Sequence, residues 1–396
     1  MQKKALLIRV LLAISAIGAT TCQSLNKVAD VADIILDSAE MLDKGRIAAY
    51  KEDPRQLIQD FRRVQRNYLR LVNALRGNVS KKWGKDEVKI PSQKQYVKYT
   101  QNYLSRATVG FDTGVITIET LDEKNPPVSM KNAIVTTLLT PDDPQSVDLF
   151  SDKQVRLSSE RKPYLYGLVV DQNNQPINSP ESAETFAEHL LKYQMKARQI
   201  QVGDQEKKAV FVKFGMVSNF EDKQAEMYEP IVATYAEKYQ TSKSLVLAMI
   251  KTESNFNPFA VSPAPAYGLM QLVPTSGGRT GYRKAKGRDS IPSKDLLFDP
   301  KTNIELGTAY LNVLAYNQLN DIADLTSREY CVISAYNTGP RNVLNTFSKD
   351  LDSAFETINQ MTPPDVYAKL IRELPYNETR QYLPAVIQHR KAYVRF

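Results

Sequence analysis

The chain has 396 residues, of which 42% are hydrophobic and 24% charged, and its formal net charge is +8. These fractions exclude a disordered chain and a protein with many membrane spans, and the length predicts two or three domains. The basic balance suits an anionic partner such as nucleic acid, anionic lipid or an acidic polymer. With only two His and two Cys, a His-based metal site and a Ser-His-Asp triad are disfavoured and a disulfide framework is excluded.

The first 21 residues have the pattern of an export signal. Two lysines precede the apolar run 5–19, which is too short to span a bilayer comfortably. Cys22 follows at the position where bacterial lipoproteins carry the cysteine that receives lipid and becomes the mature N-terminus. Ala19 and Thr21 depart from the usual residues of that signal, so ordinary cleavage with an unmodified Cys22 stays an alternative. We therefore expect a lipoprotein on the periplasmic face of the outer membrane, which Gln23 favours, or a soluble periplasmic protein.

Residues 22–221 are expected to form an accessory α/β domain. From 24 to 77 the apolar residues recur at spacings of three and four, which predicts helices, and Pro54 marks the start of one. From about 95 to 217 the period shifts toward two, which predicts a mostly antiparallel sheet. The expected strands are Val115–Leu121, Ala133–Leu139, Tyr164–Val170 and Lys208–Val217, with a helix at Phe186–Met195. We find no catalytic motif in this domain.

From residue 222 to 396 the pattern is helical, so we expect an all-α domain and an α+β chain overall. The stretch Thr275–Pro300 is rich in Gly, Ser, Lys and Arg and is expected to be mostly loop. The expected helices are Tyr228–Tyr239, Ser242–Ser254, Thr302–Gln318, Ser327–Tyr336, Asn342–Phe347 and Glu378–Tyr393.

Glu253 is the first candidate for chemistry in this domain. The six apolar residues Leu245–Ile250 predict a helix buried nearly all round, and Glu253 falls in its last turn. An apolar setting and the negative end of the helix dipole both disfavour the charged carboxylate. The pKa of Glu253 should therefore be raised, as a general acid requires near neutral pH. On spacing alone, an exposed glutamate at a helix end is the more common outcome.

Three further motifs follow Glu253. In Gly268-Leu-Met-Gln271 the glycine allows close backbone approach, and the glutamine amide suits sugar hydroxyls or N-acetyl groups. Taken alone, that motif is better explained as a helix start with Met270 in the core. Ala335-Tyr336-Asn337 precedes a helix-ending Gly-Pro, and Glu378-Thr-Arg-Gln-Tyr382 begins the last expected helix.

In order and approximate spacing, these four motifs resemble those of the soluble-lytic-transglycosylase superfamily. The segments Thr252–Pro258, Phe298–Pro300 and Gly307–Leu311 make the chain similar to the membrane-bound lytic murein transglycosylase C family in particular. The resemblance covers nearly the whole chain and is most specific over 225–396. It implies a lysozyme-like catalytic domain that acts on peptidoglycan glycan strands, with no metal, no cofactor and no nucleic acid.

The resemblance also implies roles for single residues. Glu253 would protonate the glycosidic oxygen between MurNAc and GlcNAc and then accept the proton of the MurNAc 6-hydroxyl, which gives a 1,6-anhydro end. Ser262 would hold Glu253 or the substrate's N-acetyl group. Tyr382 would lie near Glu253 across the cleft, and Glu378 would shape that wall. The remaining substrate-binding residues would be Gly268, Met270, Gln271, Tyr336 and Asn337.

Two other functions compete with this interpretation. A hydrolytic muramidase would use the same acid and add water, whereas a peptidoglycan-binding lipoprotein would not cleave at all. The four motifs favour an enzyme, and no water-activating carboxylate is evident near them. The N-terminal domain could in addition contact other cell-wall proteins.

Overall fold

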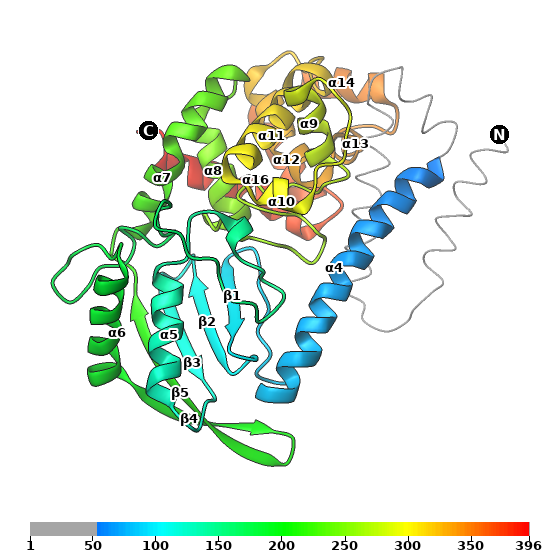
Figure 1. Ribbon diagram of the computed structural model, residues 1–396. Helices are drawn as coiled ribbons and strands as arrows, with labels where there is room; N and C mark the ends of the chain where they lie inside the picture. Colours follow the sequence, from blue (N-terminus) through cyan, green and yellow to red (C-terminus); the bar gives the residue numbers. More distant parts are fainter. Residues whose placement is uncertain (1–53, 396) are drawn as a thin grey trace.

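The computed structural model describes residues 54–395 (Figure 1), so the export signal and Cys22 lie outside the described residues. The first helix of this part is α4 (Pro54–Trp83). Next comes a five-stranded antiparallel sheet in the order β1-β2-β3-β5-β4. No helix within residues 54–395 is long and apolar enough to cross a membrane. The strands are β1 (Gln95–Thr100), β2 (Ser105–Gly110), β3 (Val115–Thr120), β4 (Lys196–Val202) and β5 (Gln205–Gly215).

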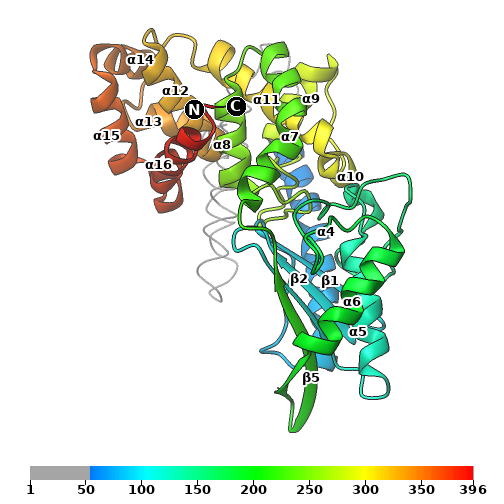
Figure 2. The ribbon, with the colours of Figure 1, turned by 90° about the vertical axis from the view of Figure 1, so that its left-hand side faces the viewer.

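Helices α5 (Pro126–Leu138) and α6 (Pro180–Gln194) cover one face of the sheet (Figures 1 and 2). The ring of Phe186 on α6 meets Phe214 on β5 edge to face, 5.6 Å between centroids. The strands at Val115–Leu121 and Lys208–Val217 and the helix at Phe186–Met195 are confirmed in position, with ends shifted by a few residues.

Two expected strands are wrong. Residues 133–139 belong mostly to α5, which begins at Pro126 and buries Met130, Ala133 and Ile134 at helical spacing. Residues 164–170 form turns with isolated bridges, because Gly167 has a φ of +75° that a strand does not accommodate. Strands β1, β2 and β4 were not singled out from the sequence.

The opposite face of the sheet holds a buried ion cluster. Arg106 on β2 is fully buried, and its Nε donates to Glu119 Oε2 on β3 at 2.9 Å. Its guanidinium lies 4.2 Å from the ring centroid of Trp83, the last residue of α4. Glu87 pairs with Arg198 of β4 at 2.5 Å, and Arg198 also reaches Glu119 at 3.0 Å. These charges tie the end of α4 to three strands.

The remainder of the described chain is helical, as expected. A short 3-10 turn, η1 (Pro144–Ser146), precedes this part, and a π-helical turn, η2 (Leu314–Gln318), extends α11. The expected boundary at 221/222 falls inside α7 and stays a proposal. The helices are α7 (Phe220–Lys238), α8 (Lys243–Ser254), α9 (Gly277–Lys286), α10 (Lys294–Phe298), α11 (Pro300–Val313), α12 (Leu325–Thr338), α13 (Pro340–Asn345), α14 (Leu351–Gln360), α15 (Pro363–Glu373) and α16 (Asn377–Ala392).

The expected loop Thr275–Pro300 is wrong in part, because it contains α9 and α10. The glycines that argued for a loop serve close packing instead. A Cβ on Gly281 would lie 2.1 Å from the Leu306 carbonyl oxygen, so α9 can approach α11 this closely only with glycine there. The packing of α9 on α11 thus outweighs the low helix propensity of the glycines in α9.

The sheet domain packs against the end of α8. Phe259 meets Tyr96 of β1 and Tyr164, with ring centroids 4.9 and 5.1 Å apart. Asn255 Nδ2 donates to the Phe111 carbonyl oxygen at 2.5 Å, and Asn257 Nδ2 donates to that of Gln93 at 3.0 Å. The backbone just after α8 is thus held by carbonyl groups of the sheet domain.

Candidate active site

Helix α8 carries Glu253 in its last turn. The Ser242 hydroxyl caps its N-terminus by accepting from the Leu245 N–H, and residues 245–250 are all buried. Asn255 ends the helix in the left-handed conformation with a φ of 53°, which asparagine tolerates better than most residues. The expected helix and its end are therefore confirmed, and together they fix the direction of Glu253.

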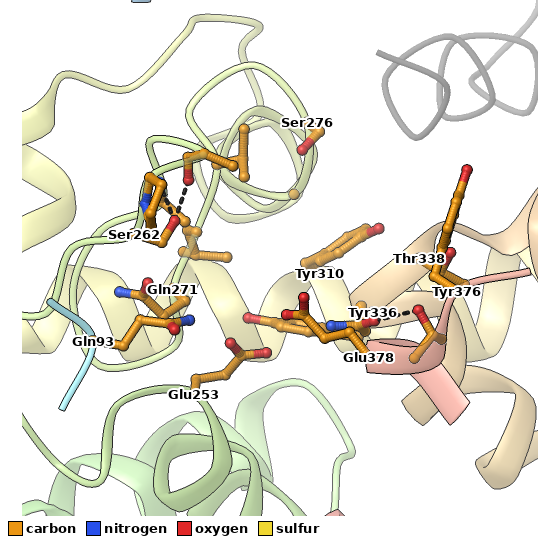
Figure 3. Close-up of a pocket in the computed structure, with 18 residues that line it drawn as sticks. Gln93, Glu253, Ser262, Gln271, Ser276, Tyr310, Tyr336, Thr338, Tyr376 and Glu378 are labelled. Atoms are coloured by element: carbon orange, nitrogen blue, oxygen red, sulfur yellow. Dashed lines mark hydrogen bonds between the residues drawn. The ribbon is translucent and has the colours of Figure 1, made fainter. Parts of the chain in front are cut away.

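Glu253 points into a cleft of about 1050 Å³, a volume that includes its open mouth (Figure 3). All of its lining residues except Gln93, which precedes β1, come from the part of the chain after α7. The lining residues are Gln93, Glu253, Ser262, Pro263, Ala264, Ala266, Gln271, Leu272, Val273, Ser276, Gly277, Tyr310, Tyr336, Asn337, Thr338, Tyr376, Glu378 and Thr379.

The carboxyl group of Glu253 is held by Tyr382. The Tyr382 hydroxyl donates to Glu253 Oε1 at 2.5 Å and lies 3.5 Å from the Met249 sulfur. Burial raises the pKa of Glu253 to about 8, and the negative charge of Glu378 adds to the rise, whereas the Tyr382 hydrogen bond opposes it. Glu253 is consequently protonated at neutral pH and able to give up a proton.

The wall to one side of Glu253 is built by α12 and the start of α16. The Tyr336 hydroxyl donates to the Met270 carbonyl oxygen at 2.7 Å, so its ring is fixed along the cleft. Burial raises the pKa of Tyr336 well above its ordinary value, which keeps the hydroxyl a donor. The Thr379 hydroxyl donates to Asn337 Oδ1 at 2.7 Å. This bond fixes the orientation of the Asn337 side-chain amide.

The turn Gly268–Gln271 ends in the facing wall, which Gln271, Leu272 and Val273 line. Gly268 has a φ of +75°, and a Cβ there would lie 2.4 Å from the Leu297 carbonyl oxygen. Asn303 of α11 secures the turn, since its Oδ1 accepts from the Met270 N–H and its Nδ2 donates to the Tyr267 carbonyl oxygen. Gln271 Nε2 donates to Gly268, but Gln271 Oε1 is buried and has no hydrogen-bond partner. Among the described residues with a buried, unpaired side-chain polar atom, Gln271 is the one that lines the cleft.

Not every expected residue reaches the cleft with its side chain. Glu253, Ser262, Gln271, Tyr336, Asn337 and Glu378 line it, and Tyr382 contacts Glu253 from behind. Two expected residues do not line it: Gly268 packs against Leu297 and Asn303, and Met270 is fully buried with its side chain against Gly307. The Ser262 hydroxyl binds its own loop, at the Ala264 carbonyl and the Ala266 N–H, and makes no hydrogen bond to Glu253.

Several lining residues carry no local sequence signal. Gln93 lies in the segment before β1, far from the motifs in sequence, and its amide stands near that of Gln271 in Figure 3. Ser276 and Gly277 belong to the stretch expected to be loop. The ring of Tyr310 on α11 packs against that of Tyr336 at a tilt of 42°, with centroids 5.3 Å apart, and only this three-dimensional contact distinguishes Tyr310 from other core aromatics.

Two protein-family models match the chain and together span most of it. Residues 51–227 match the N-terminal domain of membrane-bound lytic murein transglycosylase C. Residues 230–359 match the transglycosylase SLT domain. Both limits at the junction fall within α7.

Curated relatives extend the similarity over both domains. The chain is 43% identical over 327 residues to membrane-bound lytic murein transglycosylase C of Yersinia enterocolitica, which covers 82% of this chain and 89% of that protein. The protein of the same name from Yersinia pestis is 42% identical over the same shares.

Among solved structures, the chain resembles the lytic transglycosylase Slt of Pseudomonas aeruginosa and the 70 kDa soluble lytic transglycosylase of Escherichia coli. The identities are 28% and 25%, and both TM-scores are 0.32. Each match covers 42% of this chain and 24% of the longer solved chain.

Proposed function

Because the chain belongs to the membrane-bound lytic murein transglycosylase C family, we propose that it cleaves the MurNAc–GlcNAc β-1,4 bond of peptidoglycan without water and leaves 1,6-anhydroMurNAc ends. The observation that carries this proposal is the position of Glu253, which lines the cleft with its carboxyl group held by the Tyr382 hydroxyl, and its burial raises the pKa to about 8. A carboxyl group that is neutral at pH 7 can act as a general acid on a glycosidic oxygen.

In the first step, Glu253 gives its proton to the glycosidic oxygen, so that the GlcNAc side leaves as an alcohol. The carbonyl oxygen of the MurNAc N-acetyl group attacks C1 as this bond breaks, which replaces a protein nucleophile. The Tyr382 hydroxyl, 2.5 Å from Oε1, stabilises the carboxylate that remains.

In the second step, the Glu253 carboxylate takes the proton of the MurNAc 6-hydroxyl. The freed O6 forms the bond to C1 as the N-acetyl oxygen departs, and Glu253 returns to its protonated form. One carboxyl group thus serves as acid and then base, whereas hydrolytic glycosidases use two. Glu378 lines the same cleft, and we assign it an electrostatic role on Glu253 rather than the activation of water.

The substrate's amide and hydroxyl groups would be positioned by the cleft walls. Gln271 Oε1, buried and unpaired, offers an acceptor for the N-acetyl N–H. Asn337 offers its amide hydrogens, and Tyr336 a ring face for a sugar. Ser262 contributes through the loop that its hydroxyl braces.

We further propose that the enzyme acts in cell-wall turnover from the periplasmic face of the outer membrane. The name of the relatives, membrane-bound lytic murein transglycosylase C, supports an association with a membrane. Lipidation at Cys22 would supply the anchor, and a contact of the N-terminal domain with other cell-wall proteins remains part of the proposal.

The proposed reaction is tested by the mass of the muropeptides released from purified peptidoglycan. We expect anhydro ends, one water lighter than hydrolytic products. Reducing MurNAc ends as the main product would replace the transglycosylase with a muramidase, and sedimentation with the polymer without release would indicate a binding protein.

The pH dependence of kcat/KM should report the protonation of Glu253. Activity is expected to fall as the pH rises through about 8, because the acid then loses its proton. Tyr382→Phe removes a hydrogen bond that favours the carboxylate, so this alkaline limb should move to higher pH. Glu378→Gln removes a negative charge that disfavours the carboxylate, so the limb should move to lower pH.

Glu356→Gln, on the exposed side of α14, provides the matched control and should leave the profile unchanged. If the alkaline limb moves in the same direction in Tyr382→Phe and in Glu378→Gln, the opposite effects assigned to these two residues on the pKa of Glu253 are wrong.

A further inference from the structure

Helix α4 has a strongly basic outer face that the cleft does not use. From Phe61 to Lys85 the sequence contains no Asp or Glu. The apolar side of the helix, with Tyr68, Val72 and Leu75, is buried. We call the exposed cations of this stretch the basic face; they are Arg62, Arg63, Arg66, Arg70, Arg76, Lys81 and Lys85.

The charges of the basic face repel one another. Arg62, Arg66 and Arg70 follow at intervals of four residues and therefore lie in one row on the helix surface. None of these three forms a salt bridge with an acidic side chain among residues 61–395, the part of the chain whose side chains the structure describes; Arg66 Nε donates to the Arg62 carbonyl oxygen at 3.3 Å. Like charges at this spacing destabilise a helix. An anionic surface against the row would therefore reduce the repulsion between these arginines.

A hollow lies at the C-terminal end of the same face. Its lining combines two cationic side chains, a hydroxyl and two partly buried apolar side chains, a composition that fits a phosphate group attached to an apolar tail. The Ser80 hydroxyl donates to the Gly77 carbonyl oxygen at 3.2 Å, one turn earlier on α4. The lining residues are Arg76, Gly77, Ser80, Lys85, Val88 and Ile90.

We propose that the basic face of α4 docks on a membrane that contains anionic phospholipid. Three observations favour a membrane over the wall polymer. The charges follow one helix of 30 residues rather than a groove. The hollow combines cationic and apolar side chains. Two exposed leucines flank Arg70 of the arginine row. Leu69 and Leu71 are 44% and 38% exposed, and a basic helix with exposed leucines suits a lipid interface.

Membrane docking would be a second property of the chain, since no residue of the basic face lines the cleft at Glu253. It would also orient the enzyme, because α4 would lie flat on the membrane. The attraction between α4 and anionic lipid does not depend on lipidation of Cys22. A lipid anchor at Cys22 would strengthen membrane binding further, because stable anchoring commonly combines one lipid chain with one polybasic surface.

The test uses sedimentation of the chain without residues 1–22, which keeps every described residue, with vesicles of phosphatidylglycerol and phosphatidylcholine. We expect binding that weakens as NaCl rises and is nearly absent on phosphatidylcholine alone. The variant Arg62→Gln/Arg66→Gln/Arg70→Gln should bind roughly 100-fold more weakly. The charge-matched control Lys192→Gln/Lys301→Gln/Lys349→Gln removes three exposed lysines elsewhere and should bind like the parent.

Other outcomes would overturn the proposal. Equal binding to both kinds of vesicle, or no loss in the arginine variant, would exclude electrostatic docking through α4. If the arginine variant instead loses binding to purified peptidoglycan and not to vesicles, the partner is the wall. Displacement from vesicles by inorganic phosphate, but not by chloride of equal ionic strength, would assign the hollow to free phosphate. Release of muropeptides by both variants would show that they are folded.

Discussion

Glu253→Gln is expected to lower the release of muropeptides by roughly a thousand-fold or more, the scale of a lost general acid. The amide cannot give a proton to the glycosidic oxygen, and it cannot take one from the MurNAc 6-hydroxyl, so both proposed steps fail. Binding to glycan should persist, because the walls made by Gln271, Tyr336 and Asn337 are untouched.

The same variant should be more stable than the parent protein, which separates lost chemistry from lost folding. The folded pKa of Glu253, about 8, lies above the ordinary 4.5, so the folded chain holds a proton that the unfolded chain has released at pH 7. The stability that the protonated acid contributes is full below pH 4.5 and is lost as the pH rises toward 8. A neutral glutamine avoids this loss, and at pH 7 its gain should reach roughly 3 kcal/mol.

Two measurements check this prediction. Muropeptide release gives the activity, and urea unfolding at pH 4 and pH 7 gives the free energy of unfolding, which should diverge between variant and parent only at the higher pH. Glu356→Gln should match the parent in both. Substantial release by the Glu253→Gln protein would disprove the acid–base assignment.

The second large effect is expected far from the cleft, in the ion cluster of the sheet. Glu119→Gln should lower the free energy of unfolding by about 3–5 kcal/mol, because it leaves the Arg106 charge buried without its main partner. Its remaining partners are weaker or uncharged: Glu87 across 3.4 Å, a backbone carbonyl oxygen, the Tyr99 hydroxyl at 3.5 Å and the Trp83 ring. Urea unfolding of the variant measures the loss, and Glu206→Gln on the exposed part of β5 is the matched control.

A double variant tests the physical reason for that loss. Arg106→Met/Glu119→Leu removes both charges, so most of the stability should return, and Glu87 keeps Arg198 as a partner at 2.5 Å. If the double variant is as unstable as Glu119→Gln, packing rather than an unpaired charge explains the effect. In the parent, arginine contacts lower the pKa of Glu119 and lower that of Glu87 to about 2. The stability contributed by Glu87 should therefore fade as the pH drops from 4.5 toward 2, and that of Glu119 should fade below pH 4.5.

The elements that sequence predicted well are those with strong periodicity and clear ends. Helix α8 has six consecutive apolar residues between Ser242 and Asn255, and α12 ends at a Gly-Pro pair. The segment 133–139 was mistaken for a strand because a short apolar run looks alike in both structures. The Pro-Pro start at Pro126 was the signal that should have decided it.

The candidate site divides in the same way. Glu253, Gln271 and Glu378 belong to local motifs, so the sequence pointed to them and the fold brings them to one cleft. Gln93 reaches that cleft through contacts between domains, and no local pattern encodes such a contact. Met270 was expected in the cleft with its neighbours, but a turn with positive φ at Gly268 and at Gln271 directs its side chain into the core.

The amide contacts beyond α8 have a consequence for how the chain comes apart. Asn255 and Asn257, which end the helix of Glu253, are satisfied by carbonyl groups of the sheet domain, and Phe259 inserts its ring among that domain's aromatics. Cutting the chain before α7 would strip these groups of their partners while every catalytic motif stayed in place. The two domains should accordingly unfold in a single cooperative transition. In the truncated protein, Glu253 should lose its fixed orientation before the helices themselves unfold.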